Sequence, residues 1–349
     1  MIKKILTIIL SVYMVMAVSG CGVKTETLSV DTPNESVDVS SDFESETKVE
    51  YYNPLTGLAG ISKDKLDDRP VAIMINNIST AQPVQTGIAK ADIVYETEVE
   101  GGITRLLAVY QDVSKVSKIG SIRSARYPYV DLALGHNAIY LHHGSDPTYC
   151  GPHLKDIDDI NIDENNYATR IKNGLSSEHT LYTYGEKLWS GMVKDGIKTE
   201  NSNSNTWVSF ADAETPVSYT NVANAVSVSF SSSYKTTFKY DMAASSYVRY
   251  FNNTIRKDYN TGETFNFKNV FVLMTTIKDY PDGYHRQVLL ESGTGYYCVN
   301  GTYTEIKWSK GNAKNGFKFI NVDGTELKVN PGNSWVCIVD KTKSVPVFE

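Results

Sequence analysis

Most of the side chains that could bind a charged ligand or transfer a proton fall within one stretch, residues 96–146. It contains Glu100-Gly101-Gly102-Ile103-Thr104-Arg105, then Arg123-Ser124-Ala125-Arg126, and the pair His142-His143. Guanidinium groups bind carboxylates and phosphates through two parallel hydrogen bonds, and histidine is the side chain that exchanges protons near neutral pH. We therefore expect a ligand of the folded part of the chain to bind here.

Arg123 and Arg126 flank the expected start of a helix. Residues 125–136 have a helical pattern with Pro128 in the first turn, and Ser124 is the expected N-cap. A helix N-terminus carries free N–H groups and a positive partial charge, so two arginines beside it favour an anion. The pattern therefore predicts an anion-binding site at this helix end.

The acidic residues upstream lie on an expected strand. Residues 93–100 alternate in character, so Glu96, Glu98 and Glu100 share one face of that strand. Three carboxylates on one face could bind a hard cation, pair with the arginines, or face the solvent. Pairing of the arginines with Glu98, Glu100 or Asp131 is the alternative to an anion site, and the sequence leaves it open.

His142 and His143 lie at the end of a strand expected over residues 137–142. Adjacent side chains of a strand point to opposite faces, so only one of the two histidines can face a site. His142 and Glu100 are the candidate catalytic residues for acid–base chemistry, and a hydrogen-bonded structural histidine is the alternative. The chain contains no recognised nucleophile motif and no metal-ligand spacing, so we predict neither a cofactor nor a metal site.

The first 20 residues have the layout of a secretory signal peptide. Lys3 and Lys4 precede an apolar run over residues 5–18, shorter than the roughly 20 residues of a transmembrane helix. Val18-Ser19-Gly20-Cys21 matches the lipobox of bacterial lipoproteins, so cleavage before Cys21 would free its thiol and amine for acylation. The sequence predicts a lipid anchor at Cys21 that holds the protein on the extracytoplasmic face of the cell membrane. A plain signal peptide is the alternative.

The rest of the chain divides into a tether and two expected domains. Residues 21–50 are acidic and rich in Ser and Thr, with too little apolar surface to fold, so they form an expected disordered tether. The remainder approaches the size of about 250–300 residues at which single cores stop growing. We place a boundary at the polar run 201–205. It separates a mixed α/β N-terminal domain, residues 51–205, from a β-rich antiparallel C-terminal domain, residues 206–349, in an α+β protein.

The C-terminal part has a sequence of short strands and tight turns. Asn300-Gly301 and Asp323-Gly324, each between strand-like runs, predict hairpins. Asp282-Gly283-Tyr284-His285-Arg286 is the polar cluster that stands out among these strands. The region's many tyrosines could form a ligand face, although half-buried strand tyrosines explain them equally well.

Composition and charge exclude some partners. Of 349 residues, 41% are hydrophobic, as in globular proteins, and the net charge of −6 arises largely in the tether, which gives no argument for a nucleic-acid partner. Once Cys21 is acylated, the cysteines that remain are Cys150, Cys298 and Cys337, so at most one disulfide can form within the chain. Cys298 and Cys337 each lie in a strand-like run and are expected in the core, and their pairing is left open.

These motifs together resemble the YerB-like lipoproteins, a family of Gram-positive surface proteins. The resemblance covers nearly the whole chain after the tether. Ser121 stands where the family has proline, and His143 stands where it has a small residue. The resemblance implies an α+β first domain and a β-rich second domain, and it implies no activity, because the family is of unknown function. It is carried by Arg69-Pro70-Val71-Ala72, the Glu100–Arg105 and Arg123–Arg126 motifs, Tyr140, His142, Gly144, Gly293, Gly295, Trp308 and Pro331-Gly332.

Two functions from different classes follow. The first is a membrane-anchored, non-catalytic binding or assembly module for an anionic component of the cell envelope, and this is the function that we predict. The alternative is an extracytoplasmic hydrolase that cleaves cell-wall glycan or phosphodiester bonds through His142 and a carboxylate. The sequence identifies no protein partner. The predicted binding residues are Glu100, Arg105, Arg123, Ser124, Arg126 and His142.

Overall fold

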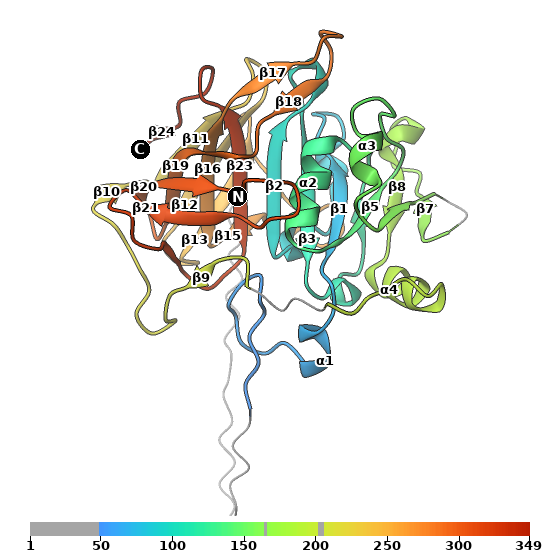
Figure 1. Cartoon of the computed structure of the whole chain (residues 1–349), viewed down its shortest axis with the longest axis horizontal. Helices are drawn as coiled ribbons and strands as arrows, with labels where there is room; N and C mark the ends of the chain where they lie inside the picture. Colours follow the sequence, from blue (N-terminus) through green and yellow to red (C-terminus); the bar gives the residue numbers. More distant parts are fainter. Residues whose placement is uncertain (1–48, 164–165, 202–205) are drawn as a thin grey trace, which may run out of the picture. The chain divides into compact units, whose positions relative to one another are not determined.

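The computed structural model describes residues 49–163, 166–201 and 206–349, which fold mainly as strands with a few short helices (Figure 1). This confirms the α+β class. The predicted signal peptide, Cys21 and nearly all of the predicted tether lie outside the described residues. Within the described ranges, no helix combines the length and the apolar character needed to cross a bilayer.

The helices are short, and most lie in the first half of the chain. The α-helices are α1 (Lys63–Leu66), α2 (Tyr127–Gly135), α3 (Gly151–Leu154) and α4 (Gly185–Lys194). The 3-10 turns are η1 (Gln82–Val84), η2 (Ile88–Lys90), η3 (Glu100–Gly102), η4 (Val113–Lys115) and η5 (Ser177–His179).

A large mixed sheet takes strands from both halves of the chain. Its order is β10 (Asn221–Val222), β20 (Thr302–Ser309), β19 (Ser292–Val299), β16 (Asn269–Thr275), β23 (Ser334–Asp340), β2 (Ile93–Glu98), β3 (Thr104–Tyr110), β1 (Val71–Asn76), β5 (Ile139–His142) and β6 (Asp159–Asn161), with β21 (Lys318–Asn321) paired to β20.

The strand β23 joins the two halves of this sheet. It pairs in parallel with β2 on one side and with β16 on the other, and Trp335 lies opposite Val94 and Val270. In Figure 1, β23, coloured red, runs beside β2, coloured teal. The sheet is therefore continuous past the boundary predicted at residues 201–205, and the chain from Val49 onward forms one compact unit. A division at that boundary stays a prediction.

Smaller sheets complete the fold. A second sheet has the order β14 (Thr254–Ile255), β13 (Ser246–Phe251), β12 (Lys235–Asp241), β11 (Ala225–Ser229) and β24 (Val347–Phe348), with β15 (Asn266–Phe267) paired to β13. The short pairings are β4 (Ile119–Gly120) with β8 (Leu181–Thr183) and β7 (Ala168–Arg170), β17 (Ile277–Asp279) with β18 (Arg286–Val288), and β22 (Lys328–Val329) with β9 (Ser209–Phe210).

The antiparallel character predicted for the C-terminal half holds for its hairpins but not for every strand. Asn300 and Gly301 have φ of 51° and 72°, as a two-residue turn with positive φ at both positions requires, and they join β19 to β20. The strands β11, β12 and β13 are also antiparallel neighbours. β23 departs from the prediction because both of its partners run parallel to it.

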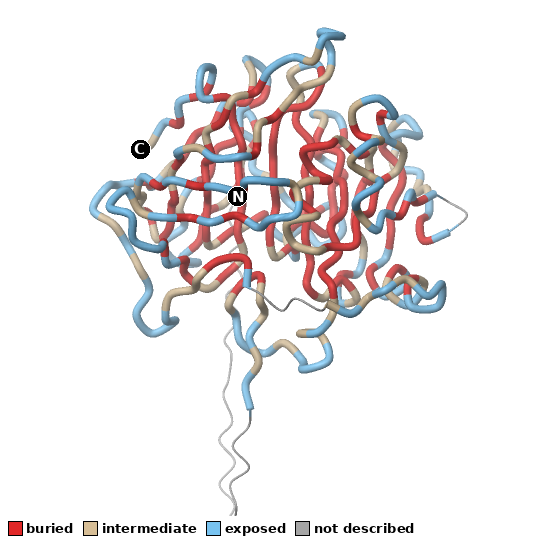
Figure 2. Tube along the Cα trace, in the orientation of Figure 1, coloured by how far each residue is buried: buried red, intermediate tan, exposed pale blue. Residues whose placement is uncertain are grey.

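The main sheet is buried on both faces, as the red strands of Figure 2 show. One face, with Val94, Val272 and Trp335, packs against apolar side chains of the second sheet. The other face packs against α2 and against Phe317 and Phe319. Complete burial of one large apolar side chain stabilises the fold by about 1.5–3 kcal/mol, so this double-sided core fixes the positions of the strand ends.

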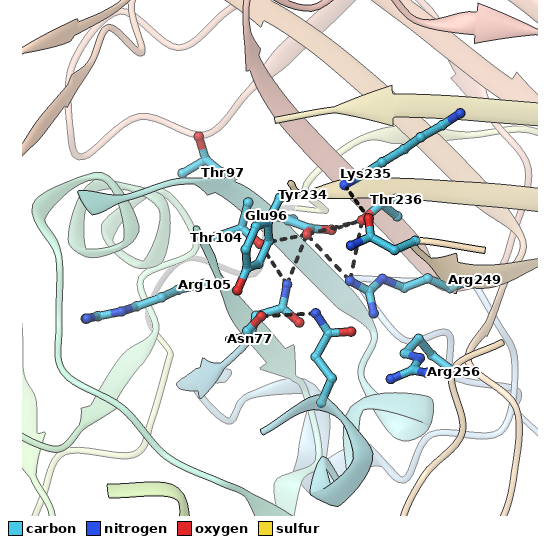
Figure 3. Close-up of polar contacts among 12 residues, drawn as sticks. Asn77, Glu96, Thr97, Thr104, Arg105, Tyr234, Lys235, Thr236, Arg249 and Arg256 are labelled. Atoms are coloured by element: carbon cyan, nitrogen blue, oxygen red, sulfur yellow. Dashed lines mark hydrogen bonds and ion pairs between the residues drawn. The ribbon is translucent and has the colours of Figure 1, made fainter. Parts of the chain in front are cut away.

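Burial on both faces places the carboxylate of Glu96 inside the core. Its side chain lies on the same face as Val94 and is fully buried, so the solvated strand face that the sequence left open does not exist at this position. A buried carboxylate is strongly disfavoured unless it is paired and hydrogen-bonded. Figure 3 shows the partners that gather around it.

The main partner of Glu96 is Arg249, which reaches it from the second sheet. Arg249 Nη2 lies 3.5 Å from Glu96 Oε1, and both side chains are fully buried. Asn77 and Thr104 donate hydrogen bonds to Glu96 Oε1 at 3.0 and 2.9 Å, and Thr236 donates to Oε2 at 3.2 Å. The Arg249 guanidinium also lies 4.5 Å from the ring centre of Trp335. The buried pair of Glu96 and Arg249 thus links the main sheet to the second sheet, and Arg249 also contacts Trp335 of β23.

We predict that Arg249→Met lowers the free energy of unfolding by about 3–5 kcal/mol, because it leaves Glu96 buried without a counter-charge. Urea unfolding of the purified protein measures the change. The matched control is Lys90→Met, which breaks the exposed Lys90–Glu263 pair and should cost about 1 kcal/mol or less. Equal effects of the two substitutions would contradict the structural role of the buried pair.

Candidate functional site

The turn after β2 presents Glu100 to the arginines of the predicted site. Gly101 and Gly102 have φ of 68° and 69°, a left-handed conformation that glycine adopts without strain, so the chain reverses sharply between β2 and β3. This reversal places the Glu100 carboxylate, on a side chain that is 9% exposed, beside the start of β3 and of α2.

Glu100, Arg105 and Arg126 form a compact group, called here the arginine centre. Arg105 Nη2 donates to Glu100 Oε1 at 2.7 Å, and Arg126 donates through Nε to Oε2 at 2.8 Å and through Nη2 to Oε1. Arg126 therefore grips the carboxylate with two parallel hydrogen bonds, the strongest geometry for this pair. The structure thus supplies the internal partner that the sequence left open for Arg126.

The remaining donors of the arginine centre fix the nearby backbone. Arg105 Nη1 donates to the carbonyl of Ser124, and Arg126 Nη1 donates to the carbonyl of Ala125 at 2.8 Å. Both carbonyls belong to the segment that leads into α2. The centre thereby holds the backbone directly after Arg123.

The charges of the arginine centre stabilise one another. Burial raises the pKa of Glu100, but Arg105 and Arg126 lower it by more, so the pKa lies below its usual value of 4.5. Burial lowers the pKa of Arg105 to about 10, with Arg126 adding to the effect and Glu100 opposing it. Arg105 remains a cation at neutral pH, and the centre holds one negative and two positive charges.

The predicted helix start was wrong by two residues. α2 begins at Tyr127, Arg126 is its N-cap, and the side chain of Ser124 caps nothing. The reason is a backbone contact that the local pattern does not reveal: Ala125 donates to the Gly144 carbonyl at 2.9 Å and forms a bridge with Ser145. This contact keeps the segment before Tyr127 extended.

Arg123 has a different environment from Arg126. Its Nη2 lies 2.9 Å from Glu178 Oε2, and the two side chains are 25% and 51% exposed. Arg170 lies close by, because it donates to the Ser177 carbonyl at 2.5 Å and lies 3.2 Å from Nε2 of His143. We call Arg123, His143 and Arg170 the basic surface cluster. Sequence reasoning missed Arg170, which stands in a short strand outside any motif.

His142 is buried and fully engaged. It is 1% exposed, its Nδ1 lies 2.7 Å from the Gly144 carbonyl, and its Nε2 lies 2.9 Å from Asp159 Oδ2. Both ring nitrogens contact groups of the protein and the side chain is buried, so neither nitrogen faces water or a substrate. Glu100 and His142 have separate partners and do not contact each other.

The C-terminal polar cluster packs beside the arginine centre, which the sequence did not foresee. The β17–β18 hairpin, at the top of Figure 1, brings Arg286 to within 2.9 Å of Glu98 and 2.6 Å of Asp279. His285 lies 4.0 Å from Asp146. A cavity of about 10 Å³, enough for roughly one water, remains between the hairpin and the centre.

The three acidic residues that the sequence placed together therefore each have an arginine partner. Glu96 pairs with Arg249, Glu98 with Arg286, and Glu100 with Arg105 and Arg126. Of the internal pairings that the sequence left open, the structure contains that of Arg126 with Glu100, whereas Arg123 pairs with Glu178. Within the described ranges, no cluster of three or more His, Cys, Asp or Glu side chains has the geometry to hold a metal ion.

The cysteines of the described part, Cys150, Cys298 and Cys337, are free and buried. Burial raises the pKa of the Cys150 thiol to about 12, and burial also raises the pKa values of Cys298 and Cys337. A thiol acts as a nucleophile when its pKa is lowered, and burial has the opposite effect on these three. We therefore assign them to the packing of the core.

Comparison with known proteins gives matches over both halves. Residues 55–198 match the family described as "Protein of unknown function (DUF3048) N-terminal domain", and residues 226–336 match the corresponding C-terminal domain. The chain is 29% identical over 304 residues to "Putative lipoprotein YerB" of Bacillus subtilis (strain 168), covering 82% of this chain and 85% of that protein. The crystal structure of the YerB protein from Bacillus subtilis matches with a TM-score of 0.73 and 28% identity, over 85% of this chain and 99% of that chain.

We predict that Glu100→Gln lowers the free energy of unfolding by about 3–5 kcal/mol at neutral pH, because two largely buried guanidinium groups lose their counter-charge. The pKa of Glu100 is lower in the folded protein than in the unfolded chain. Its stabilisation is therefore present above the unfolded value of 4.5 and is lost as the pH falls through the folded value.

Urea unfolding of the wild type and of Glu100→Gln, at neutral pH and at about pH 3, measures this difference. The gap between the two proteins should narrow at the lower pH. Arg123→Ala, which removes an exposed ion pair, is the control and should change stability by about 1 kcal/mol or less. A gap that stays constant across this pH range would rule out the charge of Glu100 as its source.

Proposed function

Because the chain belongs to the YerB-like lipoprotein family, we propose that it is an extracytoplasmic lipoprotein, anchored through Cys21, that acts as a non-catalytic binding or assembly module. The ligand that we propose is an anionic component of the cell envelope. The lipobox at Cys21 and the similarity to the Bacillus subtilis "Putative lipoprotein YerB" support the anchor.

The observation that carries the binding proposal is the partly exposed ion pair of Arg123 with Glu178. Exposed ion pairs contribute about 0–1 kcal/mol, so a phosphate or carboxylate of a ligand can replace Glu178 at little cost. Arg170 stands beside Arg123 and adds positive charge and hydrogen-bond donors, and His143 contacts Arg170 through Nε2. The basic surface cluster is therefore the proposed anion site.

The arginine centre has a supporting role in this proposal. Arg105 and Arg126 are tied to Glu100 and to the backbone carbonyls of Ser124 and Ala125, so they position the segment that carries Arg123. Breaking these buried bonds to bind a ligand would cost far more than displacing Glu178. The predicted binding residues thus divide into a ligand-contacting arginine, Arg123, and positioning residues.

The hydrolase alternative has less support. It requires His142 to accept a proton, and both of its ring nitrogens already contact hydrogen-bond acceptors. His142 instead links the loop at Gly144 to Asp159 at the end of the main sheet. We therefore assign His142 a structural role in the proposal.

We predict that Cys21→Ala moves the protein from the membrane fraction to the soluble fraction of the bacterium, because the acyl chains attached there hold the protein at the bilayer. Immunoblotting of fractionated cells measures the change. Ser29→Ala, another small change in the predicted tether, is the control and should remain with the membrane. Unchanged fractionation of Cys21→Ala would refute the anchor.

We predict that Arg123→Ala weakens binding of a soluble poly(glycerol phosphate) by about tenfold, because one charge-assisted pair of hydrogen bonds is lost. Titration calorimetry at low and high salt measures binding, and the loss should be larger at low salt. Arg256→Ala is the matched control, since Arg256 donates to the backbone carbonyls of Thr254 and Ile255 and forms no ion pair with an acidic residue that the structure describes.

Arg126→Ala should instead lower the stability of the fold, because Arg126 grips a largely buried carboxylate. Equal loss of binding in Arg123→Ala and Arg256→Ala would contradict the anion site. Cleavage of the polymer that His142→Ala abolishes would establish the hydrolase in its place.

A further inference from the structure

A second cavity, of about 240 Å³, lies where α2 and α3 face the segments 287–291 and 311–313. Tyr127 and Tyr280 line both this cavity and the small one beside the arginine centre. Its walls come from both halves of the chain, and ligand pockets often form at such junctions. We call it the tyrosine cleft. Its side chains include Tyr127, Asp131, His153, Tyr280, Gln287 and Glu291.

The polar groups of the tyrosine cleft, unlike those of the arginine centre, are available to a ligand. His153 donates through Nδ1 to Asp131 at 2.7 Å, which fixes the ring and leaves Nε2 without a partner among the described residues. Neither the Gln287 amide nor the Glu291 carboxylate forms a hydrogen bond or ion pair with any side chain or backbone group that the structure describes. His153 is 33% exposed, so solvent reaches this set.

Aromatic rings form the apolar wall of the cleft. The ring of Tyr127 lies 4.9 Å from that of His153 and meets the ring of Tyr280 edge-on at 5.8 Å. Tyr149 stacks on Tyr280 at 3.9 Å and continues the row outward. Neighbouring rings hold one another in place, so the aromatic wall is ordered before a ligand binds.

The far wall of the cleft is also fixed. Lys310 is 3% exposed and donates through Nζ to the carbonyls of Asn312, Ala313 and Asn315 at 3.0, 2.5 and 2.6 Å. Burial lowers the pKa of Lys310 to about 8, with Asp131 opposing this effect. The loop that carries Gly311–Ala313 is thereby tied to a single buried amine, and the cleft is formed before any ligand arrives.

We propose that the tyrosine cleft binds one neutral sugar ring of a glycan. Sugar hydroxyls both donate and accept hydrogen bonds, which suits a carboxylate, an amide and an imidazole side by side. The C–H face of the ring packs on the tyrosines. Of the two carboxylates that line the cleft, Asp131 is already hydrogen-bonded to His153, and the Lys310 cation lies buried behind the 311–313 loop. The lining therefore presents no cluster of charges of one sign to an ionic ligand.

The size of the cleft limits the ligand to one ring. Pockets for drug-sized molecules measure roughly 300–1,000 Å³, and the tyrosine cleft is smaller than this range. The neighbouring rings of the glycan therefore lie outside it. This binding does not depend on the anion site at Arg123, so either proposal stands if the other fails.

The test uses the purified full-length protein in detergent. The probes are tetrasaccharides of β-1,4-linked N-acetylglucosamine, of β-1,4-linked glucose and of α-1,4-linked glucose, titrated to millimolar concentrations and followed by the NMR signals of the His153 ring. At least one of them should shift these signals in a saturable way. Gln287→Ala and Tyr280→Ala should each weaken that binding by about tenfold.

Tyr259→Ala is the matched control, because Tyr259 is a 56% exposed tyrosine outside the cleft, and it should bind as the wild type does. Should Tyr280→Ala fail to fold, Gln287→Ala decides the outcome. Vesicles that contain a diglucosyl lipid distinguish two sources of the sugar ring. Tighter binding to the vesicles identifies a lipid headgroup as the ligand, and tighter binding to a tetrasaccharide identifies a free or wall glycan. Absence of binding to every probe, or equal weakening by Tyr259→Ala, overturns the proposal.

Discussion

The parallel pairing of β23 with both β2 and β16 is the constraint on which the rest of the structure depends. A strand from the last part of the chain separates a strand of the first half from one of the second half, so neither half completes the main sheet alone. Because β2 is fixed between β23 and β3, its end projects Glu98 and Glu100 toward the β17–β18 hairpin and α2. Both the arginine centre and the tyrosine cleft follow from that arrangement.

Charge neutralisation decides what the motif residues can do. A carboxylate inside the fold must be paired, and the acidic residues 96, 98 and 100 all take arginine partners. Those arginines are bound within the protein and build the fold. Arg123 differs because its partner, Glu178, is about half exposed to solvent. Ligand binding therefore falls to side chains whose pairing is weak, or that have no partner in the described structure.

The local pattern of apolar and polar residues predicted those strands and turns whose formation depends on neighbouring residues. The strands β2 and β5 and the Asn300-Gly301 hairpin lie where the sequence pattern and the turn residues placed them. Pairing between residues far apart in the sequence has no comparable local pattern from which it could be predicted. The parallel position of β23, the reach of Arg249 to Glu96 and the approach of Arg286 to Glu98 depend on residues far apart in the sequence. The expected cap at Ser124 failed for the same reason, since a bridge to Ser145 holds the preceding backbone extended.

The central claim is that Arg123 is exchangeable whereas Arg105 and Arg126 are fixed on Glu100. NMR of the arginine side-chain N–H groups during titration with poly(glycerol phosphate) tests it directly. The account predicts that the signal of Arg123 moves, while those of Arg105 and Arg126 stay in place and remain protected from exchange with water. Movement of the Arg105 and Arg126 signals together, with Arg123 unchanged, would contradict it.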